Sequence, residues 1–336
     1  MKWAGMPGDR ALTRIENPVT GMEMPEYLTG VIAPMFTPCN EDGSLDEDGI
    51  RSYVQWLKGT GAVTSVFVRS GVGKMLMYTM DDVRQIARVA IEEAGKEIFV
   101  LVGTSGDFSG GKPREDQYIE QTVELTQFAR DQGADGAVVV PFGMDTFGNL
   151  DEKVYSFYER LNDSGGIPII IYQPGMTPPP FMMKPGVLER VAQLPNLKGM
   201  KVSTDDMKIF GDLCAASFDE DFTMISGAET SFLPGLSLGA GGVIGEGCNT
   251  YPQVLRAVFD HFMAGELASA ARAQFLVNRT LKVWAGMDSA LVGKSYLAAK
   301  GVKIKPIPRR RKVDVEPRLD AFEKAIDSAV APFKKD

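Results

Sequence analysis

The sequence alternates eight short apolar runs with longer segments in which apolar residues recur at helical spacing, and this alternation constrains the fold more than any other feature. A run such as 137–140 (Ala-Val-Val-Val) is apolar throughout, which is typical of parallel strands buried on both faces. The repeated strand–helix order predicts βαβ units. The predicted strands are residues 30–37, 65–68, 99–103, 136–140, 168–172, 197–201, 222–226 and 242–244, and the predicted helices are residues 46–60, 80–94, 115–132, 151–164, 185–193, 205–216 and 251–264.

Eight such units need about 250 residues, and their unbroken succession predicts closure into an α/β fold, the (β/α)8 TIM barrel. An open doubly wound sheet has the same local pattern and is the alternative. We expect an N-terminal extension at residues 1–28, the barrel at 29–265, and a C-terminal helical extension at 266–336 that packs on the barrel or against another subunit. Apolar residues of this last segment recur at helical spacing and need to be covered: Leu267, Phe275, Leu281, Trp284, Leu291 and Leu297.

Charge and cysteine content restrict the partners and the compartment. A net charge of −8 and an isoelectric point near 5.0 argue against nucleic acid as a partner. The basic run at residues 309–312 (Arg-Arg-Arg-Lys) is expected in a surface loop or a subunit contact, with anion binding as the alternative. Cys39, Cys214 and Cys248 have no paired spacing, which predicts free thiols. Because no apolar stretch resembles a signal peptide or a membrane span, we expect a cytoplasmic protein without membrane contact.

Lys201 ends the sixth predicted strand, and active sites of TIM barrels lie at this end of the strands. The strand period of two places Lys201 on the same face as Leu197 and Gly199, and opposite to Lys198. If this face is the barrel interior, an amine lies at the mouth, with Gly199 leaving space beside its stem. Burial favours the neutral amine, which attacks carbonyl carbons to form a Schiff base. The alternative is a solvated lysine at a strand end.

Tyr172 ends the preceding predicted strand, and neighbouring parallel strands lie about 4.8 Å apart, so its side chain can meet that of Lys201. A phenol beside a carbinolamine can relay the proton that is lost and regained when an imine forms. The alternative is a tyrosine that only closes the top of the core. His261 is the only histidine and lies in a predicted helix away from the barrel mouth, which excludes a Ser-His-Asp triad or a histidine zinc site there.

Four segments, in this order along the chain, resemble the signatures of one family. They are 32–38 (Ile-Ala-Pro-Met-Phe-Thr-Pro), 172–175 (Tyr-Gln-Pro-Gly), 198–201 (Lys-Gly-Met-Lys) and 239–245 (Gly-Ala-Gly-Gly-Val-Ile-Gly). They are similar to the successive motifs of the dihydrodipicolinate synthase and N-acetylneuraminate lyase family. The similarity covers roughly residues 30–297.

The resemblance implies a lyase of the class I aldolase type that is a homo-oligomer, either a dimer or a tetramer. Lys201 would form an imine with pyruvate or a related 2-oxo acid, and Tyr172 would shuttle protons. The enamine would then add to an aldehyde, or the reverse cleavage would release one. The family needs no metal and no organic cofactor. The substrate-binding residues that the resemblance implies are Ser70, Gly71, Val72 and Ile244.

Three departures from the family pattern bear on the substrate. The usual Gly-Thr-Thr-Gly-Glu loop, whose hydroxyls hold the substrate carboxylate, reads Ser-Gly-Val-Gly-Lys at residues 70–74, so backbone N–H groups would have to hold a carboxylate. Residues 175–178 (Gly-Met-Thr-Pro) lack the arginine with which the synthase binds its aldehyde, so true dihydrodipicolinate synthase activity is not expected. Residues 142–143 (Phe-Gly) replace a second tyrosine that the family donates to a neighbouring subunit.

Two other functions remain open beside the aldolase. One is a dehydratase of a sugar-derived 2-oxo acid, which would use the same lysine. The other is a barrel that has kept Lys201 but lost turnover and binds a 2-oxo acid as a regulatory protein. The altered loop at residues 70–74 suggests this last possibility.

Overall fold

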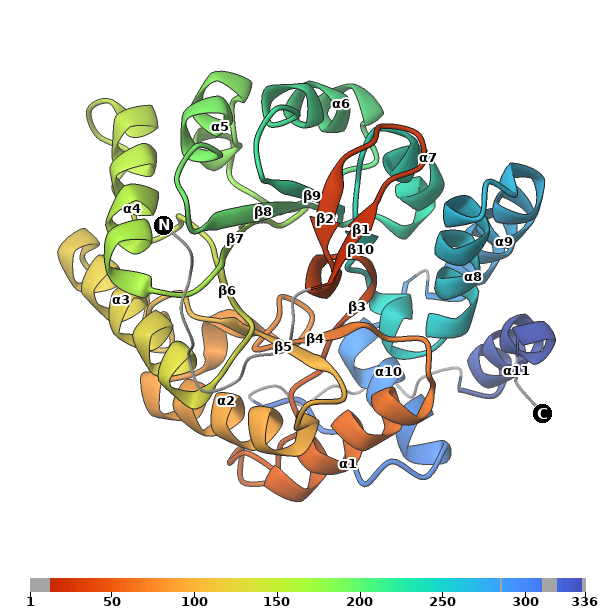
Figure 1. Ribbon diagram of the computed structural model, residues 1–336. Helices are drawn as coiled ribbons and strands as arrows, with labels where there is room; N and C mark the ends of the chain where they lie inside the picture. Colours follow the sequence, from red (N-terminus) through yellow and green to blue (C-terminus); the bar gives the residue numbers. More distant parts are fainter. Residues whose placement is uncertain (1–12, 285, 310–318, 334–336) are drawn as a thin grey trace.

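Eight parallel strands close into a barrel in the computed structural model, which describes residues 13–284, 286–309 and 319–333 (Figure 1). The closed order is β10-β3-β4-β5-β6-β7-β8-β9, with each strand parallel to its neighbours. The TIM barrel is thus confirmed, and the open doubly wound sheet is excluded. The strands are β3 (Gly30–Pro34), β4 (Ser65–Val68), β5 (Phe99–Gly103), β6 (Gly136–Val139), β7 (Ile169–Gln173), β8 (Leu197–Val202), β9 (Thr223–Ser226) and β10 (Gly242–Val243).

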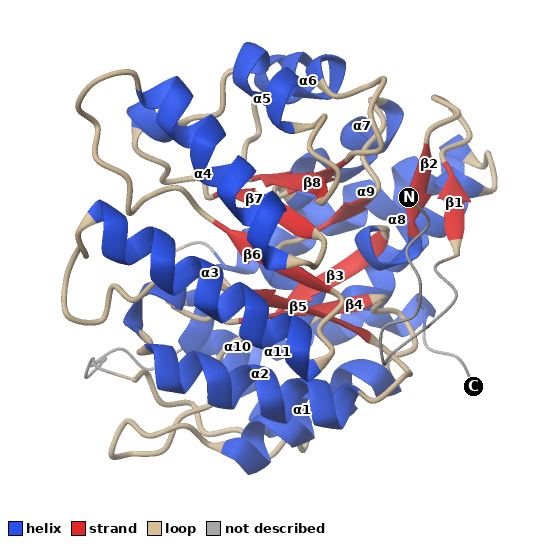
Figure 2. Cartoon of the chain, turned by 60° about the vertical axis from the view of Figure 1, so that its left-hand side comes forward, coloured by secondary structure: helices blue, strands red, loops and turns tan. Residues whose placement is uncertain are grey.

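Helices follow the strands and surround the barrel, as Figures 1 and 2 show from two directions. Of these helices, α7 was not predicted, because its six residues are too few to show a helical period. The helices are α1 (Glu47–Gly59), α2 (Met80–Ala94), α3 (Glu115–Gln132), α4 (Leu150–Gly165), α5 (Pro185–Val191), α6 (Met207–Ala216), α7 (Phe232–Ser237) and α8 (Pro252–Met263).

Local signals in the sequence determine where several helices begin and end. The side chain of Asp46 accepts a hydrogen bond from the Gly49 N–H at the start of α1. At the start of α2, Thr79 and Asp82 form a reciprocal capping box. Helix α3 ends at Gly133, whose φ of 88° lies in the left-handed region that favours glycine.

An antiparallel hairpin precedes the barrel and was not predicted. It consists of β1 (Arg14–Glu16) and β2 (Glu23–Pro25). Tyr27 and Leu28 follow the hairpin, are buried, and pack with the apolar side chains of the barrel interior. Because they lie just before β3, they fill the end of the barrel opposite the strands' carboxyl ends. Residues 1–12 of the predicted N-terminal extension lie outside the described residues.

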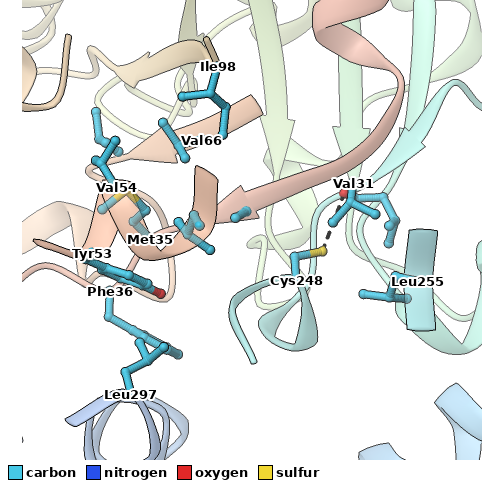
Figure 3. Packing of buried hydrophobic residues seen from close by; sticks show 14 of the residues in the cluster. Val31, Met35, Phe36, Tyr53, Val54, Val66, Ile98, Cys248, Leu255 and Leu297 are labelled. Atoms are coloured by element: carbon cyan, nitrogen blue, oxygen red, sulfur yellow. Dashed lines mark hydrogen bonds between the residues drawn. The ribbon is translucent and has the colours of Figure 1, made fainter. Parts of the chain in front are cut away.

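The main apolar core lies between strands and helices and includes part of the C-terminal extension (Figure 3). Phe36, which follows β3, stacks on Tyr53 of α1 with the ring centroids 6.4 Å apart. Leu297 of α10 lies next to Phe36 in the same cluster. The helices of this extension are α9 (Leu267–Thr280), α10 (Ser289–Ala299) and α11 (Leu319–Val330).

Some of the C-terminal apolar residues are buried within the chain, and others are exposed on its surface. Trp284 and Leu297 are buried, whereas Leu267 is 60% exposed and Phe275 is 66% exposed. Helix α9 buries a different face, which includes Ala270. Helical spacing alone identifies a stripe but not the side that packs.

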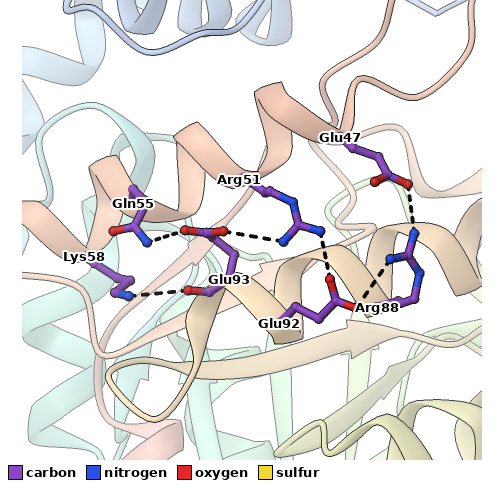
Figure 4. A network of polar contacts seen from close by, with 7 residues as sticks. All are labelled: Glu47, Arg51, Gln55, Lys58, Arg88, Glu92 and Glu93. Carbon is purple, nitrogen blue, oxygen red and sulfur yellow. Dashed lines mark hydrogen bonds and ion pairs between the residues drawn. The ribbon is translucent and has the colours of Figure 1, made fainter.

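Helices α1 and α2 are joined on their outer side by a network of charged residues (Figure 4). Arg51 pairs with Glu92 at 2.8 Å, and Arg88 pairs with Glu47 at 2.8 Å. Such partly exposed pairs contribute about 1 kcal/mol or less each. The apolar core, not this network, therefore accounts for most of the stability of the helix pair.

Other residues considered from the sequence can also be placed in the structure. Arg309 is only 11% exposed in its side chain and donates to Asp82 Oδ2 at 2.6 Å, so this member of the basic run is not solvated; residues 310–312 lie outside the described part. His261 pairs with Glu266 at 2.7 Å on the surface. The three cysteines are buried free thiols. No helix in the described ranges has the length and apolar character that crossing a membrane requires.

Candidate active site

A cavity of about 390 Å³ lies at the carboxyl ends of the barrel strands, where TIM barrels carry their active sites. Ser70 is the one predicted site residue that does not line it; the other five do. The lining residues are Pro34, Gly71, Val72, Tyr172, Lys201, Ser203, Asp205, Gly227, Ala228, Glu229, Thr230, Ile244, Gly245, Glu246 and Leu281.

Lys201 and Tyr172 lie side by side in the wall of this cavity. The two residues are register partners on β8 and β7, and each is 6% exposed. The Nζ atom of Lys201 lies 4.2 Å from the centroid of the Tyr172 ring. This ring meets Phe67 edge-on, with the centroids 6.0 Å apart. Lys201 is therefore not a solvated lysine at a strand end, and a phenol is its immediate neighbour.

The inner face of β8 differs from the prediction at the start of the strand. Consecutive residues of β7 pair with Leu197 and Gly199, so Lys198 is an extra residue in β8. Leu197 consequently packs in the outer cluster, and its predicted place beside Lys201 is wrong. A Cβ at position 199 would lie 2.5 Å from the Thr223 carbonyl oxygen. The glycine thus permits a close approach of strands and does not leave the predicted space.

The loop after β4 uses its one hydroxyl internally. Ser70 Oγ donates to the Met35 carbonyl at 2.9 Å and accepts from the Gly73 N–H at 3.0 Å. Among the described residues, the N–H groups of Gly71 and Val72 have no hydrogen-bond partner, and both residues line the cavity. The loop therefore offers backbone donors, and not a serine hydroxyl, to a ligand.

Arg69 is buried beneath this loop and holds it through hydrogen bonds to backbone carbonyls. The residue is 1% exposed, and its guanidinium donates to the carbonyls of Met75 at 3.0 Å, Gly103 at 3.2 Å, Gly106 at 3.1 Å, and Ser105. Burial lowers the pKa of Arg69 to about 10, so it remains a cation at neutral pH. Because these carbonyls occupy its donors, Arg69 holds the loop and does not line the cavity.

Glu229 is a cavity residue that sequence reasoning missed. It follows β9 by three residues and is 4% exposed. Tyr251 Oη donates to Glu229 Oε2 at 2.7 Å, and the Gly247 N–H donates to Oε1. Burial, with a smaller contribution from the nearby Glu246, raises the pKa of Glu229 to about 7, although these hydrogen bonds oppose the shift. The sequence signal that could have identified Glu229 is its place as an acidic residue just after a barrel strand.

Two more carboxyl groups line the cavity. Burial raises the pKa of Glu246, and a hydrogen bond with Ser289 opposes this effect. Asp205 accepts a hydrogen bond from the hydroxyl of Thr230. In the described part of the chain, Lys201 is the only lysine or arginine that lines the cavity. Apart from Lys201, the charged residues that line the cavity are thus acidic.

The departures from the family pattern have structural counterparts. Phe142 contacts Phe181, with the ring centroids 5.8 Å apart, and has no hydroxyl to give to a neighbouring site. Met176 is 95% exposed and does not line the cavity. Within the described residues, no three histidine, cysteine, aspartate or glutamate side chains gather closely enough to hold a metal ion.

Comparisons with known proteins agree on one family. The model of the dihydrodipicolinate synthetase family matches residues 27–320. An uncharacterized DapA-like lyase of Thermofilum pendens is 28% identical over 283 residues, which cover 83% of this chain and 90% of that protein. The 4-hydroxy-tetrahydrodipicolinate synthase of Methanospirillum hungatei is 28% identical over 260 residues, which cover 73% of this chain and 80% of the relative.

Solved structures share the fold. YagE of E. coli K12, a member of the dihydrodipicolinic acid synthase family crystallised with pyruvate, superposes with a TM-score of 0.78 at 23% identity, covering 90% of this chain and 98% of that one. The N-acetylneuraminate lyase of Fusobacterium nucleatum superposes with a TM-score of 0.78 at 20% identity, covering 92% of this chain and 100% of that one.

Proposed function

The chain belongs to the dihydrodipicolinate synthetase family and is a lyase of the class I aldolase type, and on this premise we propose that Lys201 forms an imine with pyruvate or a related small 2-oxo acid. The observation that carries the proposal is the buried Lys201 Nζ, 4.2 Å from the centroid of the Tyr172 ring, in a cavity at the strand ends. The pyruvate complex of a similar barrel supports pyruvate as the first substrate to test.

The reaction begins when the neutral amine of Lys201 attacks the C2 carbonyl of the 2-oxo acid. Tyr172 then gives a proton to the carbinolamine oxygen as water leaves, and a protonated imine remains. The Tyr172 phenolate takes a proton from C3, which produces the enamine, and C3 of the enamine adds to an aldehyde. The reverse sequence cleaves the same carbon–carbon bond and releases the aldehyde.

The substrate carboxylate binds to the backbone in this proposal. Gly71 and Val72 line the cavity, their N–H groups have no hydrogen-bond partner among the described residues, and two adjacent N–H groups can form a small anion site. Ile244 supplies an apolar wall of the same cavity. The synthase reaction itself is not proposed, since no arginine among the described residues lines the cavity to bind the aldehyde.

The proposal extends to assembly and compartment. A homo-oligomer, either a dimer or a tetramer, would cover exposed apolar side chains such as Phe147, which is 83% exposed, and Phe275. Three buried free thiols support a reducing compartment such as the cytoplasm.

Reductive trapping tests the imine. Treatment with pyruvate and borohydride should add the mass of one reduced pyruvate to each chain, and Lys201→Arg should abolish the gain. Lys198→Arg is the matched control, because Lys198 lies on the same strand but pairs with Asp221 at 2.7 Å. Labelling that persists in Lys201→Arg would refute the proposal.

A panel of 2-oxo acids extends the test to the alternatives. Release of water from a sugar-derived 2-oxo acid, without release of an aldehyde, would identify a dehydratase. Trapping without turnover on any aldehyde or 2-oxo acid would identify a binding protein.

A further inference from the structure

Glu229 is a buried carboxyl that the imine chemistry does not use. It lines the same cavity as Lys201, and its two oxygens are held by Tyr251 Oη at 2.7 Å and by the Gly247 N–H. A Cβ at position 245 would overlap the Glu229 side chain, so the backbone at Gly245 packs directly against it. The carboxyl group of this cavity-lining residue is therefore held in place by Tyr251, Gly247 and the backbone of Gly245.

The charged and titratable groups around Glu229 come from three directions. Glu246 and Cys248 face it from the turn after β10, and Tyr251 faces it from the residue before α8. Lys201 of β8 lines the same cavity. From α9, the uncharged Gln274 donates to the Glu229 backbone carbonyl at 2.8 Å. Among these described neighbours, no cation forms an ion pair with Glu229.

We propose that Glu229 is a second proton-transfer group, which acts on the oxygen of the aldehyde carbonyl while Tyr172 serves the imine. This assignment rests on the proposed function. In the addition direction, the enamine electron pair forms the bond from C3 to the aldehyde carbon, and the carbonyl π pair takes the proton of the Glu229 carboxyl. The products are the C4 hydroxyl, the iminium on Lys201 and the Glu229 carboxylate. In cleavage, this carboxylate accepts the hydroxyl proton as the carbon–carbon bond breaks.

Two considerations support separate proton-transfer roles for Tyr172 and Glu229. Tyr172 is next to Lys201, where the imine protons are transferred, whereas Glu229 follows β9, the strand beside β8 in the barrel. A group whose pKa is about 7 can both give and accept a proton near neutral pH. Hydrogen bonds from Tyr251 and Gly247 stabilise the carboxylate that forms when the proton leaves.

Two conservative variants test the assignment. Glu229→Gln keeps the shape and both hydrogen-bond partners but cannot transfer a proton, and Tyr251→Phe removes only the hydroxyl that stabilises the carboxylate. Each variant is trapped with pyruvate and borohydride, and is then assayed for pyruvate consumption with glycolaldehyde or glyceraldehyde as a function of pH. Thermal melting confirms that each variant is folded.

We expect Glu229→Gln to trap pyruvate as the wild type does but to consume it about 100-fold more slowly with aldehyde, without the kcat limb near pH 7. Tyr251→Phe should move this limb to higher pH. Wild-type turnover in Glu229→Gln, or a parallel loss of its trapping, would overturn the assignment. So would a wild type that traps pyruvate but adds neither aldehyde. A wild type that fails to trap pyruvate at all would instead overturn the imine proposal.

Discussion

The contact between Gly71 and Tyr172 links the substrate loop to the proposed proton shuttle. A Cβ at position 71 would overlap the Tyr172 hydroxyl, so this hydroxyl occupies space that any side chain at position 71 would fill. The Tyr172 ring is itself fixed between Phe67 and the amine of Lys201. The hydroxyl can therefore keep its position only while residue 71 is glycine.

Gly71→Ala should therefore slow imine formation. The added methyl displaces the Tyr172 hydroxyl, and we expect the rate of pyruvate trapping to fall about 10-fold or more, as for other small displacements of a proton-transfer group. Gly110→Ala is the control, because a Cβ at this exposed loop glycine meets nothing within 4 Å. The measurement is the initial trapping rate by mass spectrometry. Equal rates for both variants would contradict the role given to this contact.

The sequence predicted the positions of those candidate site residues that depend on one strand alone, and their catalytic roles stay predictions. Lys201 and Tyr172 each end a predicted strand, and register then places them together. Glu229 could not be identified in this way. Its raised pKa and its hydrogen bond from Tyr251 depend on burial and on contacts that form only when the chain folds. The expectation for Ser70 stays without geometric support, because its hydroxyl binds a carbonyl 35 residues earlier in the chain.

At the scale of the elements, periodicity predicted most strands and helices closely. Helices α2 and α3 have the predicted bounds. Their apolar periods indicate the helices, and capping residues mark where the helices end. The extra residue at Lys198 in β8 could not be seen, since an inserted residue leaves no composition signal. The β1–β2 hairpin was missed because its strands are three residues each.

The packing of α10 on the barrel depends on a glycine. A Cβ on Gly293 would overlap the ring of Phe36, which is itself stacked on Tyr53 (Figure 3). Gly293→Ala should therefore lower the free energy of unfolding by about 1–3 kcal/mol, because neither ring can move without disturbing the core.

Gly211→Ala in α6 should change the free energy of unfolding in the opposite direction. Its Cβ would lie 3.7 Å from Leu238 Cδ1, an ordinary contact, so the higher helix propensity of alanine should stabilise the protein by about 0.5–1 kcal/mol. Urea unfolding of both variants gives the comparison. If both variants changed the free energy of unfolding in the same direction, local packing would not determine the effect of replacing these glycines.

At the scale of the whole molecule, closure of the barrel followed from the number and order of the units. The sequence did not reveal that the C-terminal extension contributes Leu281 to the cavity. This contact joins a turn after α9 to loops that are far away in sequence, and only the closed barrel brings them together. Helical spacing carries no information about such long-range partners.

The free energy of unfolding of the whole protein should depend on whether Glu229 is protonated. Its pKa is about 7 in the folded protein against 4.5 for an ordinary glutamate, so between these values the folded state holds a proton that the unfolded state has lost. Folding is therefore favoured by this group below about pH 4.5, and the contribution is lost as the pH rises through 7.

Glu229→Gln mimics the protonated form at every pH. Relative to the wild type at equal protein concentration, its free energy of unfolding should increase by about 2–3 kcal/mol between pH 5 and pH 8. The comparison of the two proteins cancels the titration of the other carboxyl groups, which both share. Urea unfolding at the two pH values gives the answer, and a difference that does not change with pH would mean that Glu229 is already ionised in the folded protein at pH 5.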